Sequence, residues 1–219
     1  DVKGIAPGLD KMGVMLPYSP LLYLIAADFG NPLVATSGNV SGSPIIYKDE
    51  DALQLLGRQA DLILTFDRDI ITPQDDSVVQ LTKQQQPVVL RRSRGLAPAY
   101  FPNPFTSGEC ILATGAELKN SFALLHNNNL FVSQFLGDQK IYESQLSYQQ
   151  TVQHLLQLLK ATPQKIIVDT HPNCEIAAAG KAFAKETGVP LQAVQHHKAH
   201  ACAVLAENDL LNAKEDILT

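Results

Sequence analysis

The second half of the chain presents apolar and amphipathic segments in a fixed order, and this order limits the folds open to it. Three apolar segments come first, at 110–113, 122–125 and 130–134, and each has the length of a strand. An amphipathic helix around 155–159, a strand over 165–169, a helix from about 174 to 186, a strand over 191–195 and a last helix that begins near His197 are then expected. The predicted order is β-β-β-α-β-α-β-α, which gives a mixed sheet with an antiparallel edge and a parallel centre.

Turn and stop signals support this order. An Asn-rich turn at 127–129 joins the second and third strands as a hairpin. Gly188 and Pro190 end a helix that begins near Cys174, and a further strand follows them. Halves of actin-like (ribonuclease-H-like) domains have this order, so we expect an α/β fold with half of such a domain over 106–219.

The first half also reads as mixed α/β. Ser19 followed by Pro20 predicts a helix that ends at Gly30. A second helix is expected over 49–56. Prolines stiffen 96–105, which we interpret as a linker, so the predicted domains are 1–105 and 106–219. The strands predicted for this half cover 33–36, 62–66, 77–81 and 88–91.

Composition excludes several classes of protein. The net charge of -5 repels nucleic acid and anionic membranes on average, so a polyanion could bind only at a local basic site. The longest apolar run has seven residues, far short of the roughly 20 that span a bilayer. Three widely spaced cysteines without a CxxC pair are typical of a protein from the reducing cytoplasm.

The loop 36–42 combines short hydroxyl side chains, an amide and two glycines directly after a predicted strand. Backbone N–H groups in such a loop can converge on a phosphate, with Ser37 and Asn39 beside them. The alternative is an ordinary polar turn, which the same composition also favours.

Three of the five arginines fall within four positions, Arg91, Arg92 and Arg94. Alternation along a strand sends Arg91 and Arg92 to opposite faces, and a guanidinium in a cleft suits a carboxylate or a phosphate. The alternative is a solvated strand end that pairs with Asp75 or Asp76. These two residues, with Asp67 and Asp69, could instead hold Mg²⁺ beside a triphosphate, or form an exposed acidic loop.

His196 and His200 lie four residues apart at a strand-to-helix junction, so one helical turn places both imidazoles on the same side. Such a pair suits a divalent transition metal, Zn²⁺ or Fe²⁺. His197 points elsewhere and either orients a substrate or is exposed. The sequence shows no third ligand at a helical spacing.

The loop 114–120 lies between two predicted strands and carries a glycine for close backbone approach and a lysine for charge. In an actin-like half this first hairpin contacts nucleotide phosphates. An ordinary hairpin with an exposed glutamate and lysine is the alternative.

Taken together, six segments in this order resemble the HypF family, the carbamoyltransferases of [NiFe]-hydrogenase maturation. The resemblance runs nearly from end to end and is carried by segments 4–9 with 13–17, 35–39, 75–79, 91–95, 115–120 and 196–200. It implies that a partial YrdC-like domain, 1–105, activates carbamoyl phosphate with ATP as carbamoyl adenylate. A partial actin-like domain, 106–219, would then pass the carbamoyl group to the C-terminal cysteine of a maturation partner protein.

The resemblance also implies roles for individual residues. His196 and His200 fall on the metal pair, and a metal can polarise the carbamoyl carbonyl. We expect Arg91, Lys119 and His197 to be catalytic. The residues expected to bind ATP and its phosphates are Ser37, Asn39, Ser77, Arg91, Arg92, Arg94, Gly115, Glu117 and Asn120.

Two other functions stay open. One is a threonylcarbamoyl-transfer enzyme of tRNA modification, because both domains resemble enzymes of that pathway. The other is a nucleotide-binding or metal-binding fragment without catalysis. The family has further domains, so we interpret the chain as a central segment that is inactive alone, with its third metal ligand elsewhere in the protein.

Overall fold

The fold is described from a computed structural model that covers residues 2–40, 42–103, 105 and 107–213. Contacts within the chain divide it into two compact units, one ending at Ser37 and one beginning at Gly38. No helix in the described part of the chain is both long enough and apolar enough to cross a bilayer.

The first unit contains two helices, α1 (Val2–Ile5) and α2 (Pro20–Phe29). The prediction of α2 is confirmed, because the Ser19 hydroxyl accepts a hydrogen bond from the Leu22 amide at 3.3 Å. Gly30 ends the helix with a φ of 66°, a left-handed conformation that glycine adopts without strain. The strand expected over 33–36 is wrong: this apolar run has no strand partner among the described residues, and Val34 is 81% exposed.

The second unit begins with α3 (Asp49–Leu56) and a two-stranded antiparallel sheet of β1 (Val78–Leu81) and β2 (Pro87–Arg91), as predicted. The strand expected over 62–66 is absent. Its apolar residues have the right pattern but pair with no described neighbour, and Leu62 is 91% exposed. Pairing and burial, rather than intrinsic preference, decide whether such a run becomes a strand.

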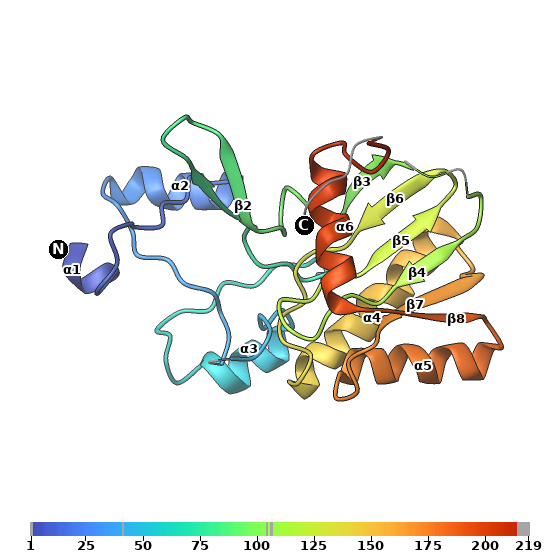
Figure 1. Cartoon of the computed structure of the whole chain (residues 1–219). Helices are drawn as coiled ribbons and strands as arrows, with labels where there is room; N and C mark the ends of the chain where they lie inside the picture. The colour runs from blue at the N-terminus through green and yellow to red at the C-terminus, as the bar shows by residue number, and fades with distance from the viewer. Residues whose placement is uncertain (1, 41, 104, 106, 214–219) are drawn as a thin grey trace. The chain divides into compact units, whose positions relative to one another are not determined.

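A six-stranded sheet follows, with the strand order β3-β6-β5-β4-β7-β8 (Figure 1). β4, β7 and β8 are parallel, and the other neighbours are antiparallel. The predicted order of elements from β4 to α6 is confirmed, although the parallel strands lie at one edge rather than in the centre. The elements are β3 (Ala99–Pro102), β4 (Ile111–Ala113), β5 (Ala123–His126), β6 (Asn129–Val132), α4 (Tyr142–Leu159), β7 (Lys165–Asp169), α5 (Glu175–Thr187), β8 (Leu191–Val194) and α6 (His196–Glu207).

The segment 96–105 differs from the expected linker. Ala99–Pro102 forms β3, which pairs with β6 in antiparallel register from Ala99 opposite Val132 to Pro102 opposite Asn129. Proline is tolerated there because β3 is an edge strand, where one side needs no ladder hydrogen bonds. Pro104, another proline of this segment, lies outside the described residues.

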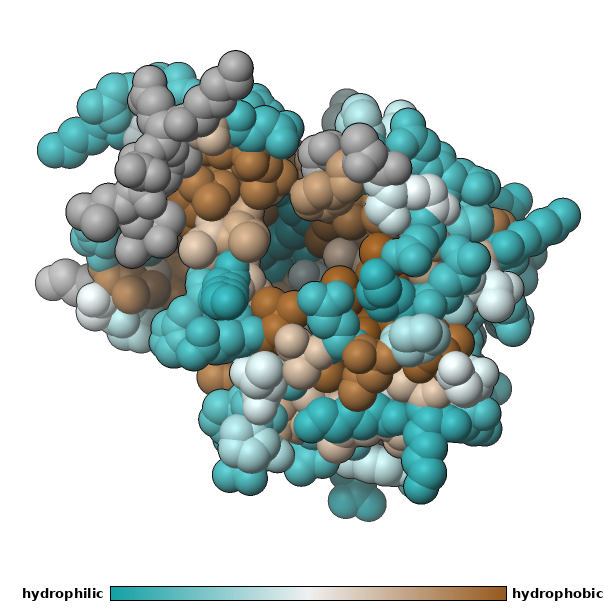
Figure 2. Space-filling view, turned by 45° about the vertical axis from the view of Figure 1, so that its right-hand side comes forward, coloured by the Kyte–Doolittle hydropathy of each residue, from teal (hydrophilic) through white to brown (hydrophobic). Residues whose placement is uncertain are grey.

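The hydrophobic core lies within residues 110–184 and fills the space between the six-stranded sheet and helices α4 and α5. Before Cys110, Ser93 is the only buried residue in the described part of the chain. Hydrophobic residues accordingly form patches on the surface (Figure 2), and many exposed large apolar side chains come from the first 105 residues.

Leu124 gives a direct test of this core. Its side chain is completely buried, so Leu124→Ala is expected to lower the free energy of unfolding by about 2–5 kcal/mol through lost burial and a cavity. Leu158→Ala on α4 is the matched control, because Leu158 is 65% exposed, and its effect is expected within about 0.5 kcal/mol. Urea unfolding followed by tyrosine fluorescence measures both, and equal losses would place the core elsewhere.

Candidate functional site

The candidate site lies where the three parallel strands end. The chain enters the loop 114–120 after β4, leaves β7 at Asp169, and begins α6 at His196 directly after β8 and Gln195. Carboxyl ends of parallel strands meet at one edge of a sheet, where α/β proteins commonly bind ligands. A cavity of about 240 Å³ opens at this edge and is lined by Ala113, Gly115, Ala116, Ile167, Val168, Asp169, Val194, His196, Ala199 and His200.

The two histidines predicted to act together do face each other. The Nε2 atoms of His196 and His200 lie 3.0 Å apart in the first turn of α6, with the rings tilted by 78°. Two imidazole nitrogens that converge on one point suit a divalent transition metal. Within the described residues no group of three or more His, Cys, Asp or Glu side chains is arranged to hold a metal ion, so the pair is the donor set seen here.

His197 lies apart from the pair. It is exposed, its ring centre is 6.3 Å from that of His196, and it is not among the residues that line the cavity. The structure thus agrees with the expectation that His197 points elsewhere in the helix.

Asp169 is a member of the site that the sequence analysis missed. Its Oδ2 atom lies 2.7 Å from His196 Nδ1, and its Oδ1 atom accepts a hydrogen bond from the His171 amide at 2.9 Å. Burial by itself raises the pKa of Asp169, but the hydrogen bonds from the His171 amide and the His196 ring bring that pKa below its usual value. A carboxylate as the last residue of a predicted parallel strand was the available signal.

The loop 114–120 owes its shape to Gly115 and Asn120. Gly115 has a φ of 81°, and a Cβ atom there would collide with the Ser121 carbonyl oxygen. The buried Asn120 side chain donates to the Thr114 carbonyl at 3.2 Å and to the Ala116 carbonyl at 2.5 Å. Asn120 therefore closes the loop on itself, while Gly115 lines the cavity.

The two charged residues of this loop take different positions. Glu117 faces the start of α5, where its Oε2 atom accepts a hydrogen bond from the Ile176 amide at 3.5 Å. Burial raises the pKa of the neighbouring Cys174 thiol, and Glu117 raises it further. Lys119 is exposed and has a left-handed φ of 49°. Neither side chain lines the 240 Å³ cavity.

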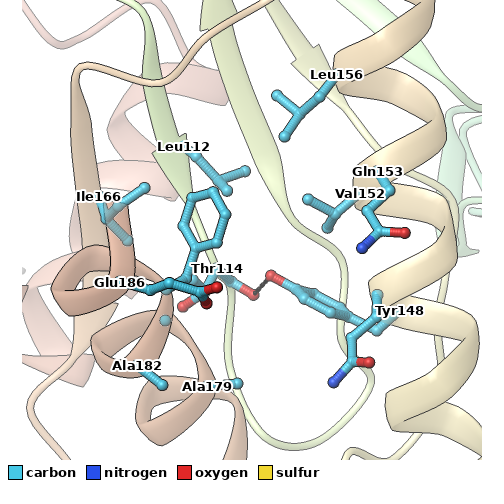
Figure 3. Close-up of a pocket in the computed structure, with 13 residues that line it drawn as sticks. Leu112, Thr114, Tyr148, Val152, Gln153, Leu156, Ile166, Ala179, Ala182 and Glu186 are labelled. Carbon is cyan, nitrogen blue, oxygen red and sulfur yellow. Dashed lines mark hydrogen bonds between the residues drawn. The ribbon is translucent and has the colours of Figure 1, made fainter. Parts of the chain in front are cut away.

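A second cavity, of about 310 Å³, lies on the opposite face of β4 and β7, between α4 and α5 (Figure 3). The Tyr148 hydroxyl from α4 donates to the Thr114 carbonyl at 3.2 Å there. Burial raises the pKa of Tyr148, so the phenol stays a neutral donor. The Thr114 carbonyl accepts from Asn120 as well as from Tyr148, which fixes the end of β4 where the site begins.

The arginine run sits at the end of β2. The Arg91 guanidinium lies 5.2 Å from the ring centre of Phe135, and the Arg92 carbonyl accepts a hydrogen bond from the Phe135 amide at 2.8 Å. Both arginines are half-buried, and their side chains make different contacts, because Arg92 reaches the Leu96 carbonyl at 3.5 Å. The run therefore touches the loop that follows β6.

Ser77 and Arg94 hold this strand end together. The Ser77 hydroxyl donates to the Arg94 carbonyl and accepts from the Ser93 amide, both at 2.9 Å. Arg94 donates to the Gln74 carbonyl at 3.0 Å and pairs with Asp76 at 3.5 Å. Arg94 thus forms the ion pair with Asp76 that was the alternative interpretation of the arginine run 91–94.

The predicted phosphate loop 36–42 falls across the boundary of the two units. Ser37 is the last residue of the first unit, and Asn39 lies in the second. The Asn39 amide donates to the Ser43 carbonyl at 3.0 Å and to the Val40 carbonyl at 3.1 Å, which closes a turn. Ser41 lies outside the described residues.

Two family models match the chain. The model described as HypF Kae1-like domain matches residues 106–207, and the Sua5/YciO/YrdC model, described as telomere recombination, matches residues 2–93. Carbamoyltransferase HypF of Synechocystis sp. is 40% identical over 96% of this chain and 27% of its own length. Carbamoyltransferase HypF of Rhodobacter capsulatus is 39% identical over 93% of this chain and 28% of its own length. The chain thus spans about a quarter of the length of these relatives.

Solved structures of HypF proteins have a similar fold. A full-length HypF in its phosphate- and nucleotide-bound form matches with a TM-score of 0.87 at 35% identity, over 95% of this chain and 32% of that one. HypF of T. kodakarensis matches with a TM-score of 0.86 at 35% identity, over 95% of this chain and 27% of that one. The resemblance to the HypF family and the mixed α/β fold are confirmed.

Gly115 gives a test of the loop geometry. Gly115→Ala forces a side chain into a left-handed conformation and against the Ser121 backbone. We therefore expect the free energy of local opening of this loop to fall by at least about 2 kcal/mol. Hydrogen exchange of the amides of 114–121 measures the loss. Gly108→Ala is the matched control, because its Cβ atom would meet no atom within 4 Å. Unchanged exchange in Gly115→Ala would contradict the described loop.

Proposed function

We propose, because the chain belongs to the HypF family of carbamoyltransferases, that the complete protein supplies activated carbamoyl groups for hydrogenase maturation. In this proposal one part of the protein activates carbamoyl phosphate with ATP as carbamoyl adenylate. Another part transfers the carbamoyl group to the C-terminal cysteine of a maturation partner. The observation that carries the proposal is the convergence of His196 and His200 at the carboxyl ends of parallel strands, in the segment that matches the HypF Kae1-like domain.

The activation step belongs to the YrdC-like segment in this proposal. Water first releases the phosphate of carbamoyl phosphate as inorganic phosphate, which leaves carbamate. An oxygen of the carbamate then bonds to the α-phosphorus of ATP, and pyrophosphate leaves. Negative charge then develops on phosphate oxygens, which a guanidinium stabilises. We assign this role to Arg91, supported by Arg92 and Arg94, with Ser37, Asn39 and Ser77 as further phosphate contacts and Mg²⁺ as counterion. Stacking on Phe135 supports the assignment, because it orients the Arg91 guanidinium.

The transfer step belongs to the Kae1-like segment. The partner's cysteine loses its thiol proton to solvent and its sulfur bonds to the carbamoyl carbon, and AMP leaves with the electrons of the broken C–O bond. His196 and His200 have the donor atoms and the spacing to hold Zn²⁺ or Fe²⁺, which would supply polarisation of the carbamoyl carbonyl. Gly115 lines the cavity and Asn120 closes the loop that carries Gly115. We assign nucleotide contacts to these two residues and to Glu117.

The exposed residues His197 and Lys119 complete the proposed transfer site. His197 follows His196 directly in the chain, and although its side chain lies outside the cavity it can orient a substrate that extends beyond the cavity. Lys119 brings positive charge to the loop beside the cavity. We place both among the catalytic residues of the complete protein.

A threonylcarbamoyl-transfer enzyme of tRNA modification is the second candidate, because the Sua5/YciO/YrdC model matches residues 2–93. The identity to HypF relatives across nearly the whole chain favours hydrogenase maturation instead. Pyrophosphate exchange by the complete protein with carbamoyl phosphate separates a catalyst from a binding protein. A requirement for tRNA in that exchange would favour the second candidate.

Arg91 tests the activation step. In the complete protein, Arg91→Ala is expected to remove roughly 2–4 kcal/mol of transition-state stabilisation, about a 30- to 1000-fold loss in carbamoyl-phosphate-dependent pyrophosphate exchange. Arg92→Ala is the control and is expected to lose less, because the Arg92 side chain turns to the Leu96 carbonyl rather than to Phe135. Undiminished exchange in Arg91→Ala refutes the assignment, and equal losses mean that both arginines contact phosphate.

The histidine pair tests the metal. His196→Ala and His200→Ala are each expected to abolish bound Zn²⁺ or Fe²⁺ in the purified complete protein, because a single remaining imidazole binds weakly. His197→Ala is the control in the same turn of α6 and is expected to leave the metal content nearly unchanged. Elemental analysis measures all three variants. Full metal content in the two cavity variants would show that the pair is structural.

A further inference from the structure

We propose that Asp169 is a positioning residue that sets the tautomer of His196 and thereby aims the Nε2 lone pair of that ring into the cavity. This inference rests on the proposed metal site at His196 and His200. It gives a role to a residue 27 positions away from His196 in the chain, which only the pairing of β7 with β8 brings into contact.

The Asp169 carboxylate is held in one orientation. Its Oδ1 atom accepts from the His171 amide at 2.9 Å, in the turn that follows β7. Its Oδ2 atom is thereby turned toward His196 Nδ1, 2.7 Å away. The Asp169 side chain is only 9% exposed, whereas that of His196 is 47% exposed, so water competes little for the carboxylate. Asp169 is therefore a fixed acceptor for the ring.

A fixed carboxylate decides which ring nitrogen carries the proton. An ionised carboxylate only accepts hydrogen bonds, so Nδ1 of His196 must carry the hydrogen. In the neutral imidazole, Nε2 then has the free lone pair, and this atom faces Nε2 of His200 at 3.0 Å. The atom that Asp169 frees is thus the one that points into the cavity between the two rings.

The same chain of contacts constrains His200. Because Nε2 of His196 is an acceptor, Nε2 of His200 must donate a hydrogen to it when no cation lies between them. If the two Nε2 atoms held a cation, that hydrogen would be displaced and His200 would carry its proton on Nδ1. Asp169 therefore fixes the tautomer of His196 before a cation binds, whereas His200 must change its tautomer on binding.

Asp169 does not itself complete the donor set. Its Oδ2 atom binds the Nδ1 side of the His196 ring, and Nδ1 and Nε2 lie on opposite sides of an imidazole. A cation held by the two Nε2 atoms is separated from this oxygen by the ring. Carboxylates that hydrogen-bond metal-ligating histidines in this way typically change metal affinity 10- to 100-fold when they are replaced.

Asp169→Asn in the complete protein tests the inference. The asparagine side chain has the same shape as aspartate, but its amide can donate a hydrogen bond to Nδ1 of His196 and so favours the tautomer with the proton on Nε2. We expect Zn²⁺ to bind 10- to 100-fold more weakly, measured by competition with a chromophoric chelator. Asp169→Ala is expected to weaken binding as well, because it leaves the ring without a fixed partner.

Asp138→Asn is the matched control. Asp138 accepts a hydrogen bond from the amide of Lys140, two residues further on, as Asp169 does from His171. No hydrogen bond joins Asp138 to a histidine among the described residues. Zn²⁺ affinity is expected to stay within about twofold of that of the unmodified protein. An equal loss in Asp138→Asn would show that loop stability, rather than the tautomer, controls affinity.

A second measurement separates this inference from the metal site on which it rests. In metal-free protein labelled with ¹⁵N-histidine, the ring nitrogen shifts are expected to show the proton of His196 on Nδ1, and to show it on Nε2 in Asp169→Asn. An unchanged tautomer together with unchanged Zn²⁺ affinity overturns the role of Asp169. A protein that binds no Zn²⁺, with the expected tautomers, overturns the metal site instead.

Discussion

The parallel pairing of β4, β7 and β8 is the constraint on which the candidate site depends. The ladder aligns Ile111 with Lys165 and Ile166 with Leu191, so the three strands end at the same edge. Segments that lie far apart in the chain thus contribute a loop, a carboxylate and a helix start to one cavity. The core beneath this edge fixes the strands, which in turn fixes the distance between Asp169 and His196. The chemistry of the site is therefore a consequence of strand register.

The helices and strands of the second half could be predicted because each is marked by apolar periodicity and by turn or stop residues within its own stretch of sequence. The Asn-rich turn, the helix stop at Gly188 and the strand at 165–169 correspond closely to the structure. The failures at 33–36 and 62–66 have a common cause. Both runs are apolar and β-branched or leucine-rich, but a strand needs a partner, and neither finds one among the described residues. An apolar sequence pattern indicates that a segment can form a strand, but it does not show whether a partner strand lies beside it.

In the site, too, the contacts set by local sequence could be predicted and those set by strand pairing could not. The spacing of His196 and His200 is local, so helical geometry predicted that they share a side. Asp169 could not be found in this way, because its contact with His196 depends on two strands and their register. Glu117 and Asn120 have residue types suited to a ligand, but the described structure shows them also serving the fold, Glu117 at the start of α5 and Asn120 within its own loop.

The pairing of β3 with β6 determines where the chain could be divided for separate expression of its parts. A polypeptide that starts at residue 106 would lack β3, which leaves one side of β6 with unpaired N–H and C=O groups. Such an open edge, lined here by residues such as Phe131, is a template for strand addition by other molecules and hence for aggregation. A version that starts before Ala99 would keep that edge covered by its own chain.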